Sequence, residues 1–235
     1  DQVMVGFEES RSHYDDPDKV TVTGTPVRED FFRYTRKQAR QQLGLTDQAP
    51  LVLSVWGSLG AEVMNRQMAE CIARECAGGA PFHHIHGAGR NYSDLLADLK
   101  TRGIDRKRYP QIDVREYIYD MPLVMAAADL VLCRAGASTI AEITAIARPA
   151  VLVPSPNVVA DHQTKNARVL ERAGGAVLLP ESACSGAALY GQIRTLLDDP
   201  GRRERMSRSL RDMAVPDAAE RIYETLRALM EKTGE

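Results

Sequence analysis

The sequence predicts an α/β fold with a Rossmann-like parallel sheet of about six strands and flanking helices. Two observations predict it. Short apolar runs rich in β-formers alternate with longer segments of helical periodicity, the order typical of strands joined by crossover helices. Glycine-rich turns follow several of these runs, and ligands gather at the carboxyl edge of parallel sheets, where such turns lie.

The composition sets the broad class of protein. The 235 residues, 44% of them hydrophobic, suffice for one large domain or for a domain with fragments of another. The net charge of −2 argues against a nucleic-acid binder held by bulk charge. The four cysteines lack paired metal-ligand spacing, which suits a reducing cytoplasm. No apolar run approaches the roughly 20 residues that span a bilayer.

The first part of the chain predicts two short strands and one helix. Residues 3–7 form an apolar run, 8–19 are polar and resemble a linker, and 20–24 alternate as a strand. A charged helix is expected over 28–43 because Gly44 supplies a stop. The chain opens on Asp-Gln-Val and not on Met, so we expect a fragment of a longer protein.

The middle of the chain repeats one motif, a strand followed by a glycine turn and a helix. The apolar run 51–56 leads into Gly57-Ser58-Leu59-Gly60 and a helix over 61–76. The strand at 82–86 places His84 and His86 on one face, where structural or substrate-edge roles are favoured because a third metal ligand is missing. The spacing of these glycines is neither the dinucleotide fingerprint nor a P-loop.

Residues 129–142 form the clearest candidate for a ligand site. An apolar run typical of a buried parallel strand leads into a tight turn, and Ser138 and Thr139 can cap the helix that follows. Free backbone N–H groups at such a helix start attract an anion, and Gly136 allows it to come close. Glu142, one turn into the helix, can accept hydrogen bonds from sugar hydroxyls. An ordinary β-turn-α unit is an equal alternative.

The remaining segments complete the alternation of strands and helices. They share the same strand and helix periodicities, and the final helix carries a single apolar stripe. The expected strands are 112–118, 149–154 and 176–179, and the expected helices are 92–103, 119–127, 161–173, one from 200 and one from 216.

Five motifs together resemble the signature of the MurG family. They occur in that family's order and cover nearly the whole chain. The motifs are Gly24-Thr25-Pro26-Val27-Arg28, Gly57-Ser58-Leu59-Gly60-Ala61, Glu116-Tyr117-Ile118-Tyr119-Asp120-Met121, residues 128–142 and Asp161-His162-Gln163-Thr164-Lys165-Asn166-Ala167.

The resemblance implies the C-terminal domain of a GT-B glycosyltransferase. The family transfers N-acetylglucosamine from UDP-N-acetylglucosamine to lipid I, with inversion and without a metal or other cofactor. Residues 1–19 are then a remnant of an N-terminal domain with its linker, and 20–215 are the UDP-sugar-binding domain. Residues 216–235 are an amphipathic helix that packs on or toward the missing domain. That domain is expected to hold lipid I, the general base and the peripheral contact with the cytoplasmic face of the bacterial inner membrane, which leaves this fragment soluble.

The resemblance also implies the substrate-binding residues. Ile118 contacts uracil, Glu142 the ribose hydroxyls, and Ser58 with the turn at 137–139 the diphosphate, near Arg28. His162 and Gln163 contact the sugar hydroxyls with support from Asn166, and Met121 forms the floor of the pocket. The full set is Arg28, Gly57, Ser58, Leu59, Gly60, Ile118, Met121, Arg134, Gly136, Ala137, Ser138, Thr139, Glu142, His162, Gln163 and Asn166.

The sequence departs from the family pattern at two turns. Trp56 replaces the first glycine of Gly-Gly-Ser, where it can crowd the phosphates or stack on the acceptor side. His86-Gly87-Ala88-Gly89 replaces His-Gln-Thr-Gly and loses two polar side chains. Two alternatives stay open: a GT-B enzyme with another lipid acceptor, and a non-catalytic nucleotide-sugar-binding subunit completed by a partner chain.

Overall fold

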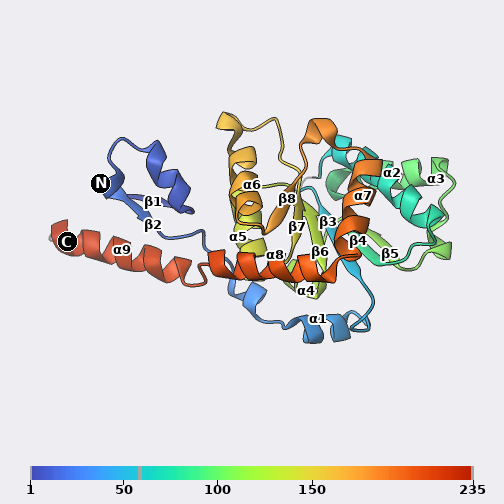
Figure 1. Ribbon diagram of the computed structural model, residues 1–235, viewed down its shortest axis with the longest axis horizontal. Coiled ribbons are helices and arrows are strands. Elements are labelled where there is room, and N and C mark those ends of the chain that lie inside the picture. Colours follow the sequence, from blue (N-terminus) through green and yellow to red (C-terminus); the bar gives the residue numbers. More distant parts are fainter. Residues whose placement is uncertain (1, 58–59, 234–235) are drawn as a thin grey trace.

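A six-stranded parallel sheet forms the centre of the molecule (Figure 1). The computed structural model describes residues 2–57 and 60–233. The strand order is β5-β4-β3-β6-β7-β8, so the direction of winding reverses between β3 and β6. The strands are β3 (Leu51–Val55), β4 (His83–Gly87), β5 (Ile112–Arg115), β6 (Leu130–Cys133), β7 (Ala150–Leu152) and β8 (Ala176–Leu178). The predicted parallel sheet of about six strands is confirmed.

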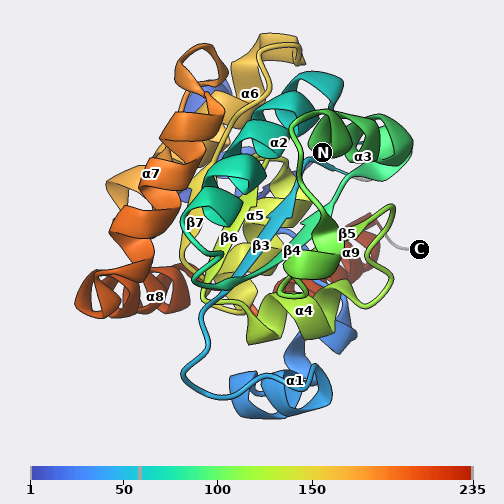
Figure 2. The same ribbon diagram turned by 90° about the vertical axis from the view of Figure 1, so that its right-hand side faces the viewer.

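Helices cover both faces of this sheet. On one face α2 and α7 pack side by side, with α3 next to α2 (Figure 2). On the other face lie α1, α4, α5 and α6. The helices are α1 (Arg36–Gln42), α2 (Glu62–Ala77), α3 (Tyr92–Thr101), α4 (Met121–Ala127), α5 (Ala137–Ala145), α6 (His162–Arg172), α7 (Gly186–Leu197), α8 (Pro200–Met213) and α9 (Ala218–Thr233).

The apolar strands divide their side chains between two cores. Leu51 and Leu53 pack with α4 and its neighbours, whereas Val52 packs with α2 and α7. All three side chains are fully buried. Successive strand residues point to opposite faces, so a strand covered on both faces must be apolar throughout.

A separate two-stranded parallel sheet lies at the end of the molecule remote from α3. It pairs β1 (Val3–Val5) with β2 (Val20–Val22), and the polar stretch between them forms short 3₁₀ helices at Glu8–His13 and Pro17–Lys19 (Figure 1). The final helix, α9, lies at the same end. The strand predicted at residues 20–24 therefore belongs with β1 and not with the six-stranded sheet.

The prediction of one continuous helix over 28–43 is wrong. A 3₁₀ helix spans Glu29–Phe32, and α1 starts afresh after Thr35. The hydroxyl of Thr35 accepts from the N–H of Gln38, and the Gln38 side chain accepts from the N–H of Thr35. This capping box satisfies backbone donors at a new helix start, so it ends the earlier turn.

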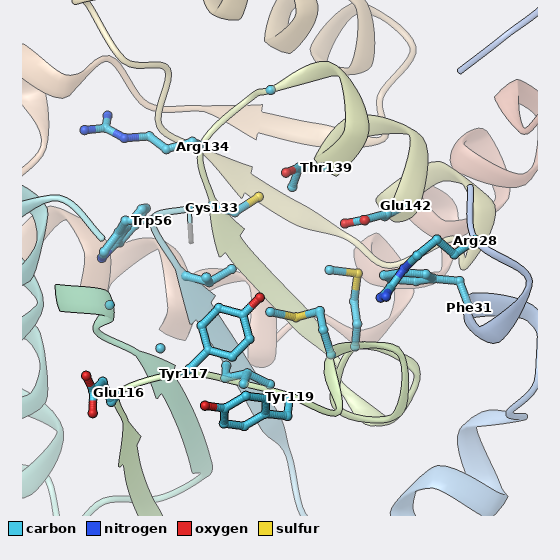
Figure 3. Close-up of a pocket in the computed structure, with 18 of the residues that line it drawn as sticks. Arg28, Phe31, Trp56, Glu116, Tyr117, Tyr119, Cys133, Arg134, Thr139 and Glu142 are labelled. Carbon is cyan, nitrogen blue, oxygen red and sulfur yellow. The ribbon is translucent and has the colours of Figure 1, made fainter. Parts of the chain in front are cut away.

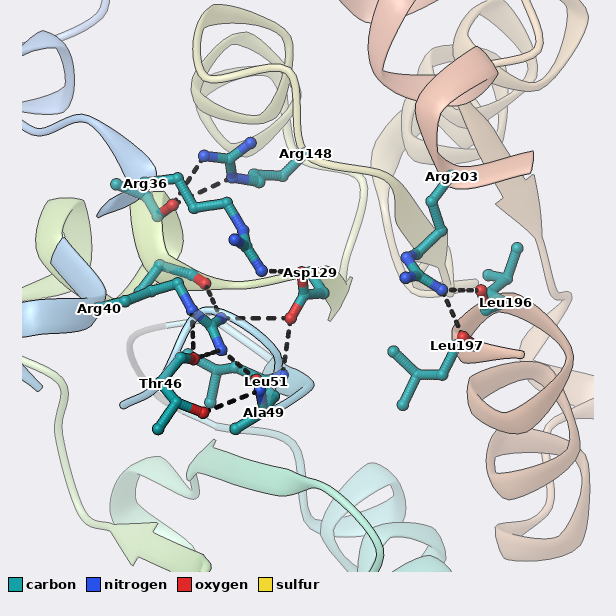
Figure 4. Close-up of polar contacts among 12 residues, drawn as sticks. Arg36, Arg40, Thr46, Ala49, Leu51, Asp129, Arg148, Leu196, Leu197 and Arg203 are labelled. Atoms are coloured by element: carbon teal, nitrogen blue, oxygen red, sulfur yellow. Dashed lines mark hydrogen bonds and ion pairs between the residues drawn. The ribbon is translucent and has the colours of Figure 1, made fainter. Parts of the chain in front are cut away.

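Charged side chains fix α1 to the amino edge of the sheet (Figure 4). Asp129, just before β6, pairs with Arg36 at 2.6 Å and with Arg40 at 3.3 Å, and it accepts from the N–H of Leu51 at 2.9 Å. The Arg40 side chain is fully buried and also donates to the carbonyl of Ala127 at 2.9 Å. A buried guanidinium needs such partners because its desolvation is otherwise costly.

Candidate functional site

A cavity of about 520 Å³ opens at the carboxyl edge of the sheet, where β3 and β6 end (Figure 3). Gly57 follows β3, Gly87 ends β4, and Cys133 and Gly136 come from the end of β6 and the turn after it. This is the point at which the winding of the sheet reverses, the usual place for a ligand in an open α/β sheet. The strand order thus places the cavity between two crossover units.

Many of the predicted binding residues line this cavity. They come from segments far apart in sequence, before the 3₁₀ helix at Glu29–Phe32, after β3 and β5, and around α5 and α6. The predicted residues in the wall are Arg28, Gly57, Ile118, Met121, Arg134, Gly136, Thr139, Glu142 and Gln163.

Other predicted residues do not line the cavity. These are Gly60, Ala137, Ser138, His162 and Asn166. Ala137, Ser138 and His162 are exposed, and the His162 ring donates from Nδ1 to the carbonyl of Val159 at 3.0 Å. The predictions for Ser58 and Leu59 fall outside the described residues.

Helix α5 begins at the cavity with its N-terminus uncapped. Gly136 is the N-cap residue, with extended φ and ψ of −66° and 149°, and no side chain caps the helix. The prediction that Ser138 and Thr139 act as caps is therefore wrong, because both already lie within the first helical turn. Backbone N–H groups of that turn stay available for an anion, and the helix dipole favours negative charge there.

Glu142 and Arg28 approach the cavity from different elements (Figure 3). Burial raises the pKa of Glu142 to about 7, Arg28 opposes this rise, and Asp30 adds to it. The Arg28 guanidinium lies 5.4 Å from the centre of the Phe31 ring, and two thirds of its side chain is exposed. A half-buried carboxyl and an accessible cation thus face the same space, an arrangement suited to hydroxyls beside an anion.

Gln163 and Asn166 on α6 fix the turn that leads into α5. The Gln163 Oε1 atom accepts from the N–H groups of Ala135 at 3.3 Å and Ser155 at 3.0 Å. Asn166 donates from Nδ2 to the carbonyl of Ala135 at 3.1 Å. Because the oxygen of Gln163 already accepts two hydrogen bonds, its NH₂ group is the part that can donate to a ligand.

Arg134 lines the cavity, but its guanidinium is largely engaged by the protein. It donates to the carbonyls of Val153 and Pro154 at 3.1 and 3.2 Å and pairs with Glu181 at 2.5 Å. These contacts join the turn after β6 to the segments after β7 and β8.

Sequence reasoning missed the aromatic part of the wall. Phe31, Tyr117 and Tyr119 line the cavity, and the two tyrosine rings lie 4.8 Å apart (Figure 3). Tyr117 and Tyr119 are about half and almost fully exposed, whereas Ile118 between them is 5% exposed. The signal was the alternation itself: exposed aromatic residues on both sides of a buried one.

Trp56 forms part of the same wall without standing in the open space. Its side chain is 3% exposed and packs in the core with Met64, and its indole N–H has no hydrogen-bond partner. The Trp56 ring thus lies in the core on the α2 face of the sheet.

Two of the three histidines of β4, His84 and His86, lie in the core, which fits the structural one of the two roles expected from the sequence. His84 and His86 are fully buried and lie outside the cavity wall. Among the described residues, no cluster of three or more His, Cys, Asp or Glu side chains could hold a metal ion. Within residues 2–57 and 60–233 no helix has the length and apolar character needed to cross a bilayer.

The strand order, with a cavity at its reversal point, is that of the C-terminal domain of a GT-B glycosyltransferase. Two solved structures share the fold. MurG of Acinetobacter baumannii is 25% identical, with a TM-score of 0.70 over 97% of this chain and 65% of that one. A UDP-GlcNAc 2-epimerase of Neisseria meningitidis, bound to UDP-GlcNAc, has a TM-score of 0.66 at 15% identity over 97% of this chain and 61% of that one.

Residues 51–222 match the glycosyltransferase family 28 C-terminal domain, and the chain belongs to that family. A transferase of Acetivibrio thermocellus is 39% identical over 230 residues, 98% of this chain and 61% of that protein. It is named UDP-N-acetylglucosamine–N-acetylmuramyl-(pentapeptide) pyrophosphoryl-undecaprenol N-acetylglucosamine transferase. A relative in a Thermoanaerobacter species carries the same name at 37% identity, over 97% of this chain and 61% of that protein. The resemblance to the MurG family is confirmed, and the chain spans about 61% of the length of these relatives.

Proposed function

We propose that this chain is the donor-binding half of an inverting, metal-independent N-acetylglucosaminyltransferase. Its donor is UDP-N-acetylglucosamine and its acceptor is lipid I, the substrates implied by the names of its relatives. The observation that carries the proposal is the meeting of the uncapped α5 N-terminus, Glu142 and Arg28 around one cavity at the reversal point of the sheet.

Each part of the donor has a matching part of the wall. Uracil lies against Ile118 and the neighbouring aromatic rings, and the ribose hydroxyls donate to Glu142. The diphosphate lies at the α5 N-terminus within reach of Arg28, and the sugar accepts from the amide of Gln163. Met121 and Gly57 complete the wall.

The reaction needs stabilisation of the leaving group. The acceptor oxygen attacks the anomeric carbon, the bond to UDP breaks, and its electron pair passes to the β-phosphate oxygen. Backbone N–H groups at the start of α5 and the Arg28 guanidinium stabilise that growing charge without a metal ion. The acceptor proton goes to a base that we assign to the N-terminal part of the longer enzyme, together with lipid I and the membrane contact. We place residues 1–19 and α9 on the side of that part.

Calorimetry with UDP and with uridine tests the proposal on this chain. We expect weak UDP binding and no sugar transfer by the chain alone. Glu142→Ala weakens the binding of both ligands by roughly 1–3 kcal/mol, the scale of a hydrogen bond to a charged group. Arg28→Ala weakens the binding of UDP but not that of uridine, because the Arg28 side chain contacts only the phosphates.

The matched control for Arg28 is Arg33→Ala, which removes an exposed arginine outside the cavity wall. No UDP binding at millimolar concentration, or equal losses from both arginine variants, would contradict the proposal. A transfer assay on the full-length enzyme with lipid I and a diacylglycerol separates the two acceptors. A parent gene without an N-terminal half would favour a binding subunit.

A further inference from the structure

A hydrogen-bonded network of five buried side chains crosses the core between the sheet and α2. Its members, from Glu75 through His84, Ser54 and His86 to Asn65, are at most 3% exposed. His84 and His86 project from β4 toward Ser54 on β3, and Glu75 and Asn65 come from α2. We call these five residues the Glu75–Asn65 network.

The contacts are short and continuous. His84 Nδ1 lies 2.9 Å from Glu75 Oε1, and His84 Nε2 lies 2.7 Å from Ser54 Oγ. Ser54 Oγ lies 2.7 Å from His86 Nδ1, and His86 Nε2 lies 3.2 Å from Asn65 Oδ1. Asn65 then donates from Nδ2 to the carbonyl of Ala88 at 2.8 Å.

The position of each proton follows from the end of the network. The Ala88 carbonyl only accepts, so Asn65 turns its oxygen to His86 and accepts from Nε2–H. Burial lowers the pKa of His86 to about 3, so the ring is neutral and its Nδ1 accepts from the Ser54 hydroxyl. Ser54 must then accept from Nε2–H of His84. The network thus has one direction, from the Glu75–His84 pair to the Ala88 carbonyl.

The Ala88 carbonyl is where this network meets the cavity. Ala88 lies between Gly87 and Gly89, which both line the cavity. The N–H groups of Ala88 and Gly89 donate to the carbonyls of Arg115, at the end of β5, and of Glu116, which follows it. Gly60 rests against the same carbonyl, because a Cβ on Gly60 would collide with it. The position of that oxygen therefore sets the spacing of two glycine turns.

We propose that the Glu75–Asn65 network is a positioning device that sets the glycine-lined wall of the cavity beside Ile118. The inference rests on the proposed binding of UDP. Cutting the network at Ser54 leaves Nδ1 of His86 buried without a donor, so the ring is held only from the Asn65 side. The ring then shifts, and the amide of Asn65 loses its fixed position against the Ala88 carbonyl.

Two measurements on the whole chain test this, with Ser54→Ala as the variant. Calorimetry should show the binding of UDP and of uridine both about tenfold weaker, the change produced by one lost hydrogen bond, because the displaced wall lies beside Ile118. Nitrogen-15 NMR of the histidine rings should show His86 protonated at Nε2 in both proteins, with a shifted Nδ1 signal in the variant because that nitrogen has lost its donor. A merely structural role leaves both affinities unchanged.

The controls keep the outcomes distinct. Ser207→Ala removes a buried hydroxyl on α8 outside the cavity wall and should change neither readout. Asn65→Asp, which keeps the acceptor and loses the donor to Ala88, should repeat the loss of UDP affinity if Ser54→Ala does not fold. Affinities for UDP and uridine that match the wild type in both variants overturn this inference alone. No UDP binding by the wild type overturns the proposed function and this inference with it.

Discussion

Replacement of Glu142 by Gln should make the protein more stable at pH 8 and leave its stability at pH 4.5 almost unchanged. Burial raises the pKa of this carboxyl from 4.5 to about 7. Between those values the unfolded chain is ionised at Glu142 and the folded chain is not, so wild-type stability falls as pH rises toward 7. Gln keeps the shape and does not titrate, so the variant avoids that loss.

The size of the gain follows from the shift. A tenfold change in proton affinity corresponds to about 1.4 kcal/mol, so a rise in pKa from 4.5 to about 7 gives an upper limit of about 3 kcal/mol. The Glu142 side chain keeps some contact with water, so we expect a gain of about 1–2 kcal/mol at pH 8.

Urea denaturation of wild type and variant at pH 4.5, 6 and 8 measures this difference. Glu171→Gln, which neutralises an exposed carboxylate on α6, is the control. Parallel stability curves for wild type and Glu142→Gln would refute the reasoning, as would an equal gain from the control. Uridine titrations on the same samples separate two roles of Glu142. A stability gain without weaker uridine binding at pH 8 would identify a buried carboxyl that does not hold ribose.

Two further predictions concern the two edges of the sheet. Gly60→Ala should lower the free energy of unfolding in urea by more than about 2 kcal/mol, because φ is +72° and the new methyl group meets the Ala88 carbonyl. Gly57→Ala should lower it by only about 1–2 kcal/mol, because φ is +91° but the methyl group meets nothing. Equal costs would contradict this account of the turn. Asp129→Ala should cost about 3–5 kcal/mol because it leaves the buried Arg40 without its carboxylate, and a loss below 1 kcal/mol would show that the carbonyl partners suffice.

The sheet and the place of the cavity were predictable because they follow from periodicity. An apolar run such as 51–56 can be buried only as a strand with both faces covered, and the glycines after it mark the carboxyl edge. The start of α5 was misplaced by two residues. Ser138 and Thr139 are good capping types, but the extended backbone of Gly136 decides where the helix begins.

Other features depended on contacts that sequence patterns do not carry. The break at Thr35 results from a reciprocal side-chain pair with Gln38, in a stretch whose charged residues suit an uninterrupted helix. The pairing of β2 with β1 is a tertiary choice, since 20–24 alternates like any half-buried strand. The tyrosines beside Ile118 enter the cavity wall only because β5 ends at Arg115 and the chain then turns across the sheet edge.

The arginine cluster around Asp129 lies far from the loops that form the ligand cavity, so different residues hold the domain together and bind its ligand. That cluster ties α1 to the strand beginnings, while the cavity is assembled from loops at the strand endings. Mutations in those loops can therefore accumulate without weakening the contacts around Asp129. Libraries aimed at a new sugar donor should vary the loops and leave the residues around Asp129 untouched.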